Sequence, residues 1–369
     1  MQKILQSFAW PRFFEEKAQN SSLRRVQACA AVLATLLVNL PARAEACESP
    51  GGYSPCVDAD TLWLAPGRSR FVGLESARVL SKRQFVAGLG ATYLVRPVEL
   101  HVASPDPDGR TIAVVDDALN VTAFAALGLG ANLELDAALP FTVFQTGAGV
   151  QGVTTQDASP LAAQALRDPR LGASYELLRG STPWAPSGKL TLRAALPLGT
   201  DDALAGDRSF VIAPGSTWTI DEQPFFAALQ VGARLRRVTE LGGARVGSQL
   251  TAGLGFGVDV LAHELLTFSA EATLLPGLAS QSHAAPDGTR STGRLIPSEW
   301  LLSARSRPLR STNLSVQLGA GMGIPLSSEE RTSPDGSSAS EHFAGVTTPR
   351  FRGVLVLRYL SELGSTPAR

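Results

Sequence analysis

The residue types that carry most enzyme chemistry are few and scattered in this chain of 369 residues. A hydrolytic site needs a nucleophile with a base within hydrogen-bond reach. The chain has four histidines. His101, His283 and His342 are predicted in loops at one end of the fold, and His263 in a turn at the other end. In each place we expect a solvated residue. Ser282 precedes His283, but sequence neighbours in a strand point apart. We therefore expect no catalytic residues and no enzyme, with a lipid-modifying enzyme as the weakest alternative.

The cysteines indicate a disulfide and not a metal site. Cys29 lies in a candidate export signal, and Cys47 and Cys56 follow it nine residues apart. That placement suits a small disulfide loop in an oxidising compartment. Zinc needs about four ligands, and no histidine lies beside these two thiols.

Two other motifs resemble ligand sites but do not have the necessary context. Asp106 and Asp108 could touch calcium, although lone loop carboxylates usually meet solvent. Gly253, Gly255 and Gly257 lie within a strand pattern, and no helix follows to receive a phosphate. We expect no metal and no cofactor.

Ionisable side chains recur opposite apolar ones at every second position. In residues 132–144, Leu133, Leu135 and Leu139 share one face, while Glu134 and Asp136 share the other. A period of two is that of a β-strand with one wet face and one apolar face. The charged residues expected to face an interior lumen are Glu134, Asp136, Arg170, Glu176, Lys189, Arg193, Arg234, Arg236, Asp259, Glu271, Glu299, Arg305, Arg350, Arg352 and Arg358.

The elements that must hold these residues are long strands. Eleven stretches have the pattern: 84–95, 119–129, 132–144, 170–178, 189–198, 225–236, 248–260, 265–275, 298–307, 313–324 and 350–360. A closed barrel normally has an even count, with long and short connections alternating. A twelfth strand at 210–220 restores that alternation, although its Pro214 cannot donate to a ladder. We predict an all-β, up-and-down antiparallel barrel of about twelve strands, with ten or fourteen as alternatives.

Three features favour a transmembrane barrel over a secreted, soluble β-sandwich. The strands run to about ten to thirteen residues, whereas soluble strands average about five or six. The polar faces are densely charged, as a wet lumen allows. Aromatic residues near strand ends suit the headgroup level: Tyr93, Phe141, Phe225, Trp300, Phe351 and Tyr359.

The first 44 residues are typical of a leader. Arg24 and Arg25 precede an apolar run at 28–40, and Ala42-Arg43-Ala44 supplies a cleavage site after Ala44. The run is too short to span a bilayer as a helix, which needs roughly 20 residues. The remaining chain has a small acidic excess, which argues against nucleic acid as a partner. The expected organisation is a signal peptide at 1–44, a periplasmic segment or plug at 45–83, a barrel at 84–360 and a tail at 361–369, in an outer-membrane protein.

Short motifs at turns and strand ends resemble a known group of barrels. They are residues 58–63 (DADTLW), 104–109 (SPDPDG), 114–116 (VVD), 134–147 (ELDAALPFTVFQTG), 167–172 (RDPRLG) and 196–200 (LPLGT). The chain is similar to Gram-negative outer-membrane barrels that precede a calcium-binding repeat and an OmpA-like domain, and distantly to the barrel family of phenol-degradation operons. The likeness implies an outer-membrane barrel. The sequence ends soon after the last strand, so we expect no OmpA-like domain and carry over no cell-wall anchoring.

Two functions remain open on the sequence. The first is a narrow porin-like channel or transporter for small solutes, with membrane lipid as its surroundings. The second is a structural or surface-displaying barrel without an open pore. Residues 45–83 could fold inside as a plug, with Lys82 and Arg83 meeting lumen carboxylates. The solute and the oligomeric state are not indicated.

Overall fold

The computed structural model describes residues 54–102, 110–152, 160–182, 184–200, 203–241, 244–261, 265–279, 281–284, 290–309, 313–332, 338–343 and 346–362. Statements below concern these residues. The predicted leader, Cys47, Asp106, Asp108, His263 and residues 363–369 lie outside them. No helix in the described ranges is long and apolar enough to cross a membrane.

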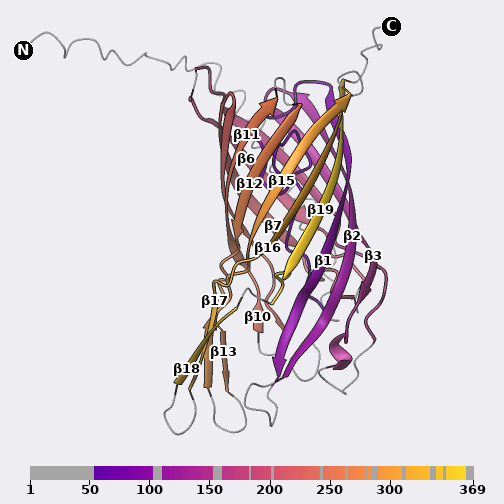
Figure 1. Cartoon of the computed structure of the whole chain (residues 1–369), viewed down its shortest axis with the longest axis vertical. Helices are drawn as coiled ribbons and strands as arrows, with labels where there is room; N and C mark the ends of the chain where they lie inside the picture. The colour runs from indigo at the N-terminus through magenta and orange to yellow at the C-terminus, as the bar shows by residue number, and fades with distance from the viewer. Residues whose placement is uncertain are drawn as a thin grey trace, which may run out of the picture. The chain divides into compact units, whose positions relative to one another are not determined.

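Twelve antiparallel strands form a closed barrel (Figure 1). They are β1 (Gln84–Val102), β2 (Arg110–Gly130), β3 (Leu133–Thr146), β5 (Arg170–Leu178), β6 (Ser187–Ala195), β7 (Val211–Glu222), β8 (Phe225–Arg234), β11 (Gln249–Leu261), β12 (Leu266–Leu274), β15 (Ser298–Leu309), β16 (Leu314–Gly323) and β19 (Phe351–Glu362). The first and last strands pair from Gln84↔Glu362 to Val95↔Phe351, which closes the sheet. The predicted all-β barrel of twelve strands is confirmed.

The twelfth predicted strand, around Pro214, is present as β7. It pairs regularly with β6 on one side, where Leu192 is the partner of Pro214. On the other side the regular ladder to β8 begins only at Gly215↔Gly232. The proline therefore lies where one ladder is interrupted, and its missing N–H leaves no regular pair broken.

The wall is apolar outside and polar inside. In β3, Leu135 is 41% exposed, whereas its neighbours Glu134 and Asp136 are 2% and 6% exposed. The six aromatic residues predicted for the rims are all exposed to a similar degree, from 37% for Trp300 to 45% for Phe225. Because hydrocarbon accepts only apolar side chains and fully paired backbone, this closed wall suits a bilayer.

One side of the interior departs from the expected ionic lining. Val86, Phe124, Leu301, Val354 and Val356 point inward and are buried. They pack against four apolar residues that precede β1, namely Leu62, Leu64, Val72 and Leu80. The sequence pattern could not show this, because the apolar partner comes from outside the strands.

The two rims differ in how much chain they carry. At the rim called here the turn rim, β2–β3 and β7–β8 are joined by the tight connections 131–132 and 223–224. At the other, the loop rim, the connections hold further structure: η2 (Val150–Gly152), β4 (Ala165–Leu166), the pair β9 (Thr239–Leu241) and β10 (Ala244–Val246), and a four-stranded sheet of β13 (Gln281–Ala284), β14 (Arg290–Arg294), β17 (Ser327–Thr332) and β18 (Ser338–Phe343). Figure 1 shows β13, β17 and β18 beyond the end of the barrel.

The predicted strands leave connections at 96–118, 276–297 and 325–349, and the prediction of loops there was wrong in part, because each holds strand residues. Val98 and Leu100 continue the alternation of β1 past the expected end, and they pack with Val114 of β2 and with apolar residues of other loop-rim connections. The sheet of β13, β14, β17 and β18 joins two connections far apart in sequence. As a result, His101, His283 and His342 lie in β1, β13 and β18 instead of in loops.

Candidate functional site

Residues 54–83, called here the inner segment, run inside the barrel wall up to their last three residues, which are exposed. Backbone groups of the segment bond to strands on several sides of the ring. The Leu80 N–H donates to Glu134 of β3 (2.8 Å), the Thr61 carbonyl accepts from Arg234 of β8 (2.9 Å), and the Ala65 carbonyl accepts from Arg358 of β19 (3.3 Å). A segment that touches β3, β8 and β19 together must lie within the ring they close.

Inward carboxylates of the wall hold the segment by its backbone. Glu271 of β12 accepts hydrogen bonds from the N–H groups of Val72 (2.8 Å), Gly73 (3.0 Å) and Leu74 (3.0 Å). Glu176 of β5 accepts one from Val79 (3.1 Å). Bonds to a charged acceptor are about twice as strong as neutral ones.

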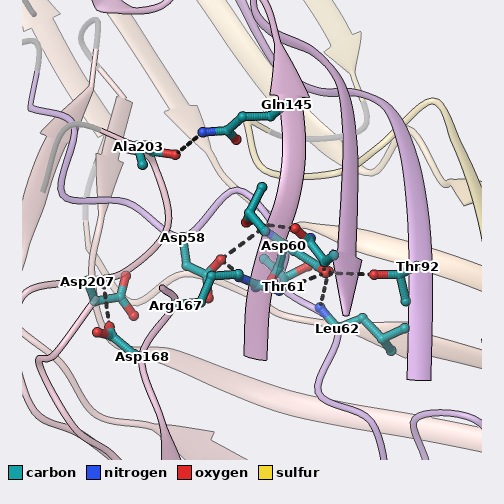
Figure 2. Close-up of polar contacts among 12 residues, drawn as sticks. Asp58, Asp60, Thr61, Leu62, Thr92, Gln145, Arg167, Asp168, Ala203 and Asp207 are labelled. Carbon is teal, nitrogen blue, oxygen red and sulfur yellow. Dashed lines mark hydrogen bonds and ion pairs between the residues drawn. The ribbon is translucent and has the colours of Figure 1, made fainter. Parts of the chain in front are cut away.

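An ionic network near the loop rim joins the inner segment to the wall (Figure 2). Asp60 is 3.1 Å from Arg167 and 2.8 Å from Arg352, and Arg167 also reaches Asp58 at 2.6 Å. Burial by itself would raise the pKa of Asp60, but Arg352 and Arg167 outweigh it and hold that pKa below its ordinary value. The aspartate is therefore ionised and bound to two cations.

A second network lies deeper. Glu75 of the inner segment pairs with Lys189 (2.5 Å) and with Arg193, both of β6, and Arg193 also contacts Asp136 at 3.0 Å. Burial opposes the ionised form of Glu75, yet Arg193 and Lys189 lower its pKa to about 2. At the turn rim, Arg70 adds pairs with Asp259 (2.8 Å) and Asp221 (2.6 Å).

A loop-rim connection is anchored by a further buried carboxylate. Asp168, between β4 and β5, accepts hydrogen bonds from the N–H groups of Gly199 and Asp207, each at 2.8 Å. Burial raises the pKa of Asp168 to about 7 despite these two donors. Figure 2 shows this contact beside Asp58 and Arg167.

The residues predicted for the lumen fall into three groups. Eleven are buried: Glu134, Asp136, Arg170, Glu176, Lys189, Arg193, Glu271, Glu299, Arg305, Arg352 and Arg358. Arg234, Arg236 and Asp259 are half-buried. Arg350 lies apart, because it precedes β19 at the loop rim, where it is exposed and pairs with Glu99 at 2.7 Å.

The partners of these residues were not predicted from the sequence. Asp58, Asp60, Arg70, Glu75 and Arg167 lie outside the alternating strands, so the period-two pattern could not select them. The short motifs at 58–63 and 167–172 contain three of them, which was the available signal. Lys82 and Arg83, expected to meet lumen carboxylates, are exposed and contact none among the described residues.

Three cavities lie between the inner segment and the wall. The loop-side cavity, about 10 Å³, is lined by Asp168, Arg170 and Arg236 among others. The central cavity, about 80 Å³, reaches from Trp63 and Arg234 to Glu75 and Arg193. The turn-side cavity, about 210 Å³, is lined by Arg68, Arg70, Arg78 and Asp221 among others.

Neighbouring cavities have lining residues in common. Thr61, Trp63 and Arg234 line both the loop-side and central cavities. Glu75 lines both the central and turn-side cavities. The three cavities therefore follow one another from one rim to the other, separated by the side chains they share.

No family model matches the chain, and no curated protein sequence matches it significantly. Among solved structures, it is similar to the COG4313 outer membrane channel from Pseudomonas putida F1, with a TM-score of 0.52 and 11% identity over 78% of this chain and 98% of that one. Two weaker matches are the TodX deltaS2S3 mutant monoaromatic hydrocarbon channel (TM-score 0.35, 9% identity, 78% and 92% covered) and Salmonella typhi OmpF complexed with daunomycin (0.25, 9%, 75% and 97%). At these identities the likeness concerns the fold.

Proposed function

We propose that the chain is an outer-membrane channel for small solutes, narrowed by the inner segment. The closed wall with an apolar outer face and a polar inner face fits a bilayer on the outside and water on the inside. The similar solved structure of a Pseudomonas putida outer membrane channel supports the same function.

The succession of cavities carries the proposal. The inner segment packs tightly against one side of the barrel, where Leu64 and Val72 meet Val356 and its neighbours. Toward β6, β7, β8 and β11 it leaves the three cavities. A barrel that served only as a scaffold would need no such asymmetry, whereas a narrow path needs one side left open.

The proposal extends to the N-terminal residues of the chain. We infer that residues 1–44 direct export and are removed after Ala44, and that residues 45–83 then fold into the lumen as the barrel closes. Cys56 is 1% exposed, and Cys47 lies outside the described residues, so the Cys47–Cys56 disulfide remains a prediction. N-terminal sequencing of the exported protein is expected to begin at Glu45, and alkylation before and after reduction tests the disulfide.

Planar-bilayer recording of the refolded mature chain tests the function. The expected result is a small, steady current, since the cavities are narrow and the inner segment fills most of the lumen. A folded barrel that gives no measurable current would eliminate the channel and favour the structural barrel.

A further inference from the structure

Arg170 and Arg234 of the lumen have no carboxylate partner among the described residues. Arg167, Arg193, Arg236 and Arg352 each form an ion pair at 3.1 Å or less. Arg170 of β5 is only 5% exposed, yet among the described residues it has neither an ion pair nor a hydrogen bond, and its one specific contact is with Trp63.

Arg234 of β8 resembles Arg170. Its one hydrogen bond in the described part of the chain goes to the carbonyl of Thr61, and no carboxylate is within ion-pair distance. Both guanidinium groups lie against the ring of Trp63, with their Cζ atoms 5.0 Å (Arg170) and 4.3 Å (Arg234) from its centroid. Cation–π contacts hold the two cations in place and leave most of their N–H donors unused.

These unused donors face the cavities between the inner segment and the wall. Arg170 and Arg234 both line the loop-side cavity, and Arg234 also lines the central one, where Trp63 separates the two. Burying donors without acceptors is costly, so water or a solute must accept from them.

The acidic residues around the loop-side cavity do not compete for these donors. Asp58 and Asp60 are bound by Arg167, and Asp207 is bound by Arg236 at 2.6 Å. Asp168 accepts from two backbone N–H groups. Each of these carboxylates is held by another arginine or by backbone N–H groups, and in the described part of the chain none of them pairs with Arg170 or Arg234.

We propose that Arg170 and Arg234, with Trp63 between the cavities, form an anion-binding subsite at the smallest of the three cavities, and that the preferred solutes are small carboxylates. This rests on the proposed channel function. The N–H groups of a guanidinium match the two oxygens of a carboxylate. The ring of Trp63 holds both guanidinium groups in position but carries no charge, so their positive charges are not neutralised. Beyond Trp63, the hydroxyl groups of Thr217, Thr251 and Thr273 line the central cavity and offer further donors.

The first test is ion selectivity in planar bilayers under a potassium chloride gradient. The wild-type protein is expected to prefer chloride, and acetate is expected to reduce the chloride current. Arg170→Gln and Arg234→Gln are each expected to lower the chloride-to-potassium permeability ratio about fivefold, since each removes one nearby charge. Arg350→Gln is the matched control, because Arg350 is exposed and paired outside the lumen; its ratio is expected to match wild type.

The second test measures binding without conduction. Sodium acetate is titrated at constant ionic strength against the detergent-purified protein, and tryptophan fluorescence is followed. A saturable change is expected in wild type and in Arg350→Gln, and its loss is expected in Trp63→Phe and in both glutamine variants. Arg170→Lys, which keeps the charge, serves if Arg170→Gln does not fold, and is expected to retain chloride preference with weaker acetate binding.

The outcomes separate the two proposals. A folded wild-type protein without current refutes the channel, and the fluorescence titration then decides on the subsite alone. Current with chloride preference unchanged in both folded glutamine variants, or acetate binding that survives both substitutions, refutes the subsite and leaves the channel standing.

Discussion

At the scale of single residues, the lumen is organised by carboxylates that bind the inner segment. Glu271 is the clearest case, since one side chain accepts three consecutive N–H groups at 2.8–3.0 Å. The segment at 72–74 has no regular secondary structure, so those N–H groups would otherwise be buried without acceptors. Glu271 is therefore expected to decide how firmly the segment stays in place.

Glu271→Gln is expected to loosen the inner segment. The amide keeps one acceptor oxygen but turns an NH₂ group toward backbone donors, and loss of hydrogen bonds to a charged group costs about 1.5–3 kcal/mol. Displacement of the segment should become about tenfold to a hundredfold more frequent. Brief high-conductance openings in single-channel records would show this. Glu240→Gln, at an exposed side chain, is the control, and an equal effect of both changes would contradict the role of Glu271.

The raised pKa of Asp168 predicts how the stability of the protein changes with pH. Its pKa is about 7 in the folded protein against an ordinary value of 3.8, so the folded state holds the proton more tightly than the unfolded chain. Its contribution to stability is therefore full below about pH 4, falls as pH rises to about 7, and is level above. Asp168→Asn is expected to flatten this part of the melting-temperature profile, whereas Asp116→Asn, at a half-exposed side chain, should retain it. A wild-type profile whose slope between pH 4 and 7 is left unchanged by Asp168→Asn would contradict the assignment.

At the scale of elements, β11 is shaped to receive the inner segment. A Cβ at Gly255 would lie 2.6 Å from Phe71 and 2.7 Å from Leu74, and one at Gly253 would lie 2.4 Å from Leu74. Gly253 and Gly255 thus leave a hollow in the inner face of β11, called here the socket, which Phe71 and Leu74 fill. This close contact accounts for glycines inside a strand.

Gly255→Ala is expected to push Phe71 and Leu74 out of that socket. Overpacking a filled site costs about 1–3 kcal/mol, and here the cost falls on the seated segment more than on the wall. Faster proteolysis within residues 54–83 of the folded barrel would be the sign. Gly215→Ala in β7 is the matched control, since its Cβ meets only the Val231 carbonyl at 3.6 Å. Equal cleavage rates in the two variants would show that the socket does not hold the segment.

At the scale of the whole molecule, the outward apolar face determines where the barrel is stable. Leu254, in the middle of β11, is 63% exposed, and Leu278, in the connection between β12 and β15, is 58% exposed. Leu254→Arg is expected to make folding into lipid vesicles less favourable by about 2–4 kcal/mol, and Leu278→Arg by about 0–1 kcal/mol. Heat-modifiable migration on a gel measures the folded fraction. Equal losses for the two variants would mean that Leu254 does not face lipid.

The sequence by itself determined the barrel, because the period of two in each strand specifies which side chains face outward and which face inward. It also located the twelfth strand around Pro214, through the alternation of long and short connections. Eleven of the fifteen charged residues selected in this way are buried, since charge on an otherwise apolar strand is tolerated best inside.

Only the tertiary structure decided what the interior contains. Asp60 and Arg352 are 292 positions apart, and no local pattern relates them. The inner segment has no period of its own, so its path past Glu271, Gly255 and Trp63 depends on contacts that exist only once the barrel has closed around it. The residues that this segment brings beside a lumen arginine decide whether its charge is paired. Arg193 meets Glu75 and is neutralised, whereas Arg170 meets Trp63 and keeps its charge unpaired among the described residues.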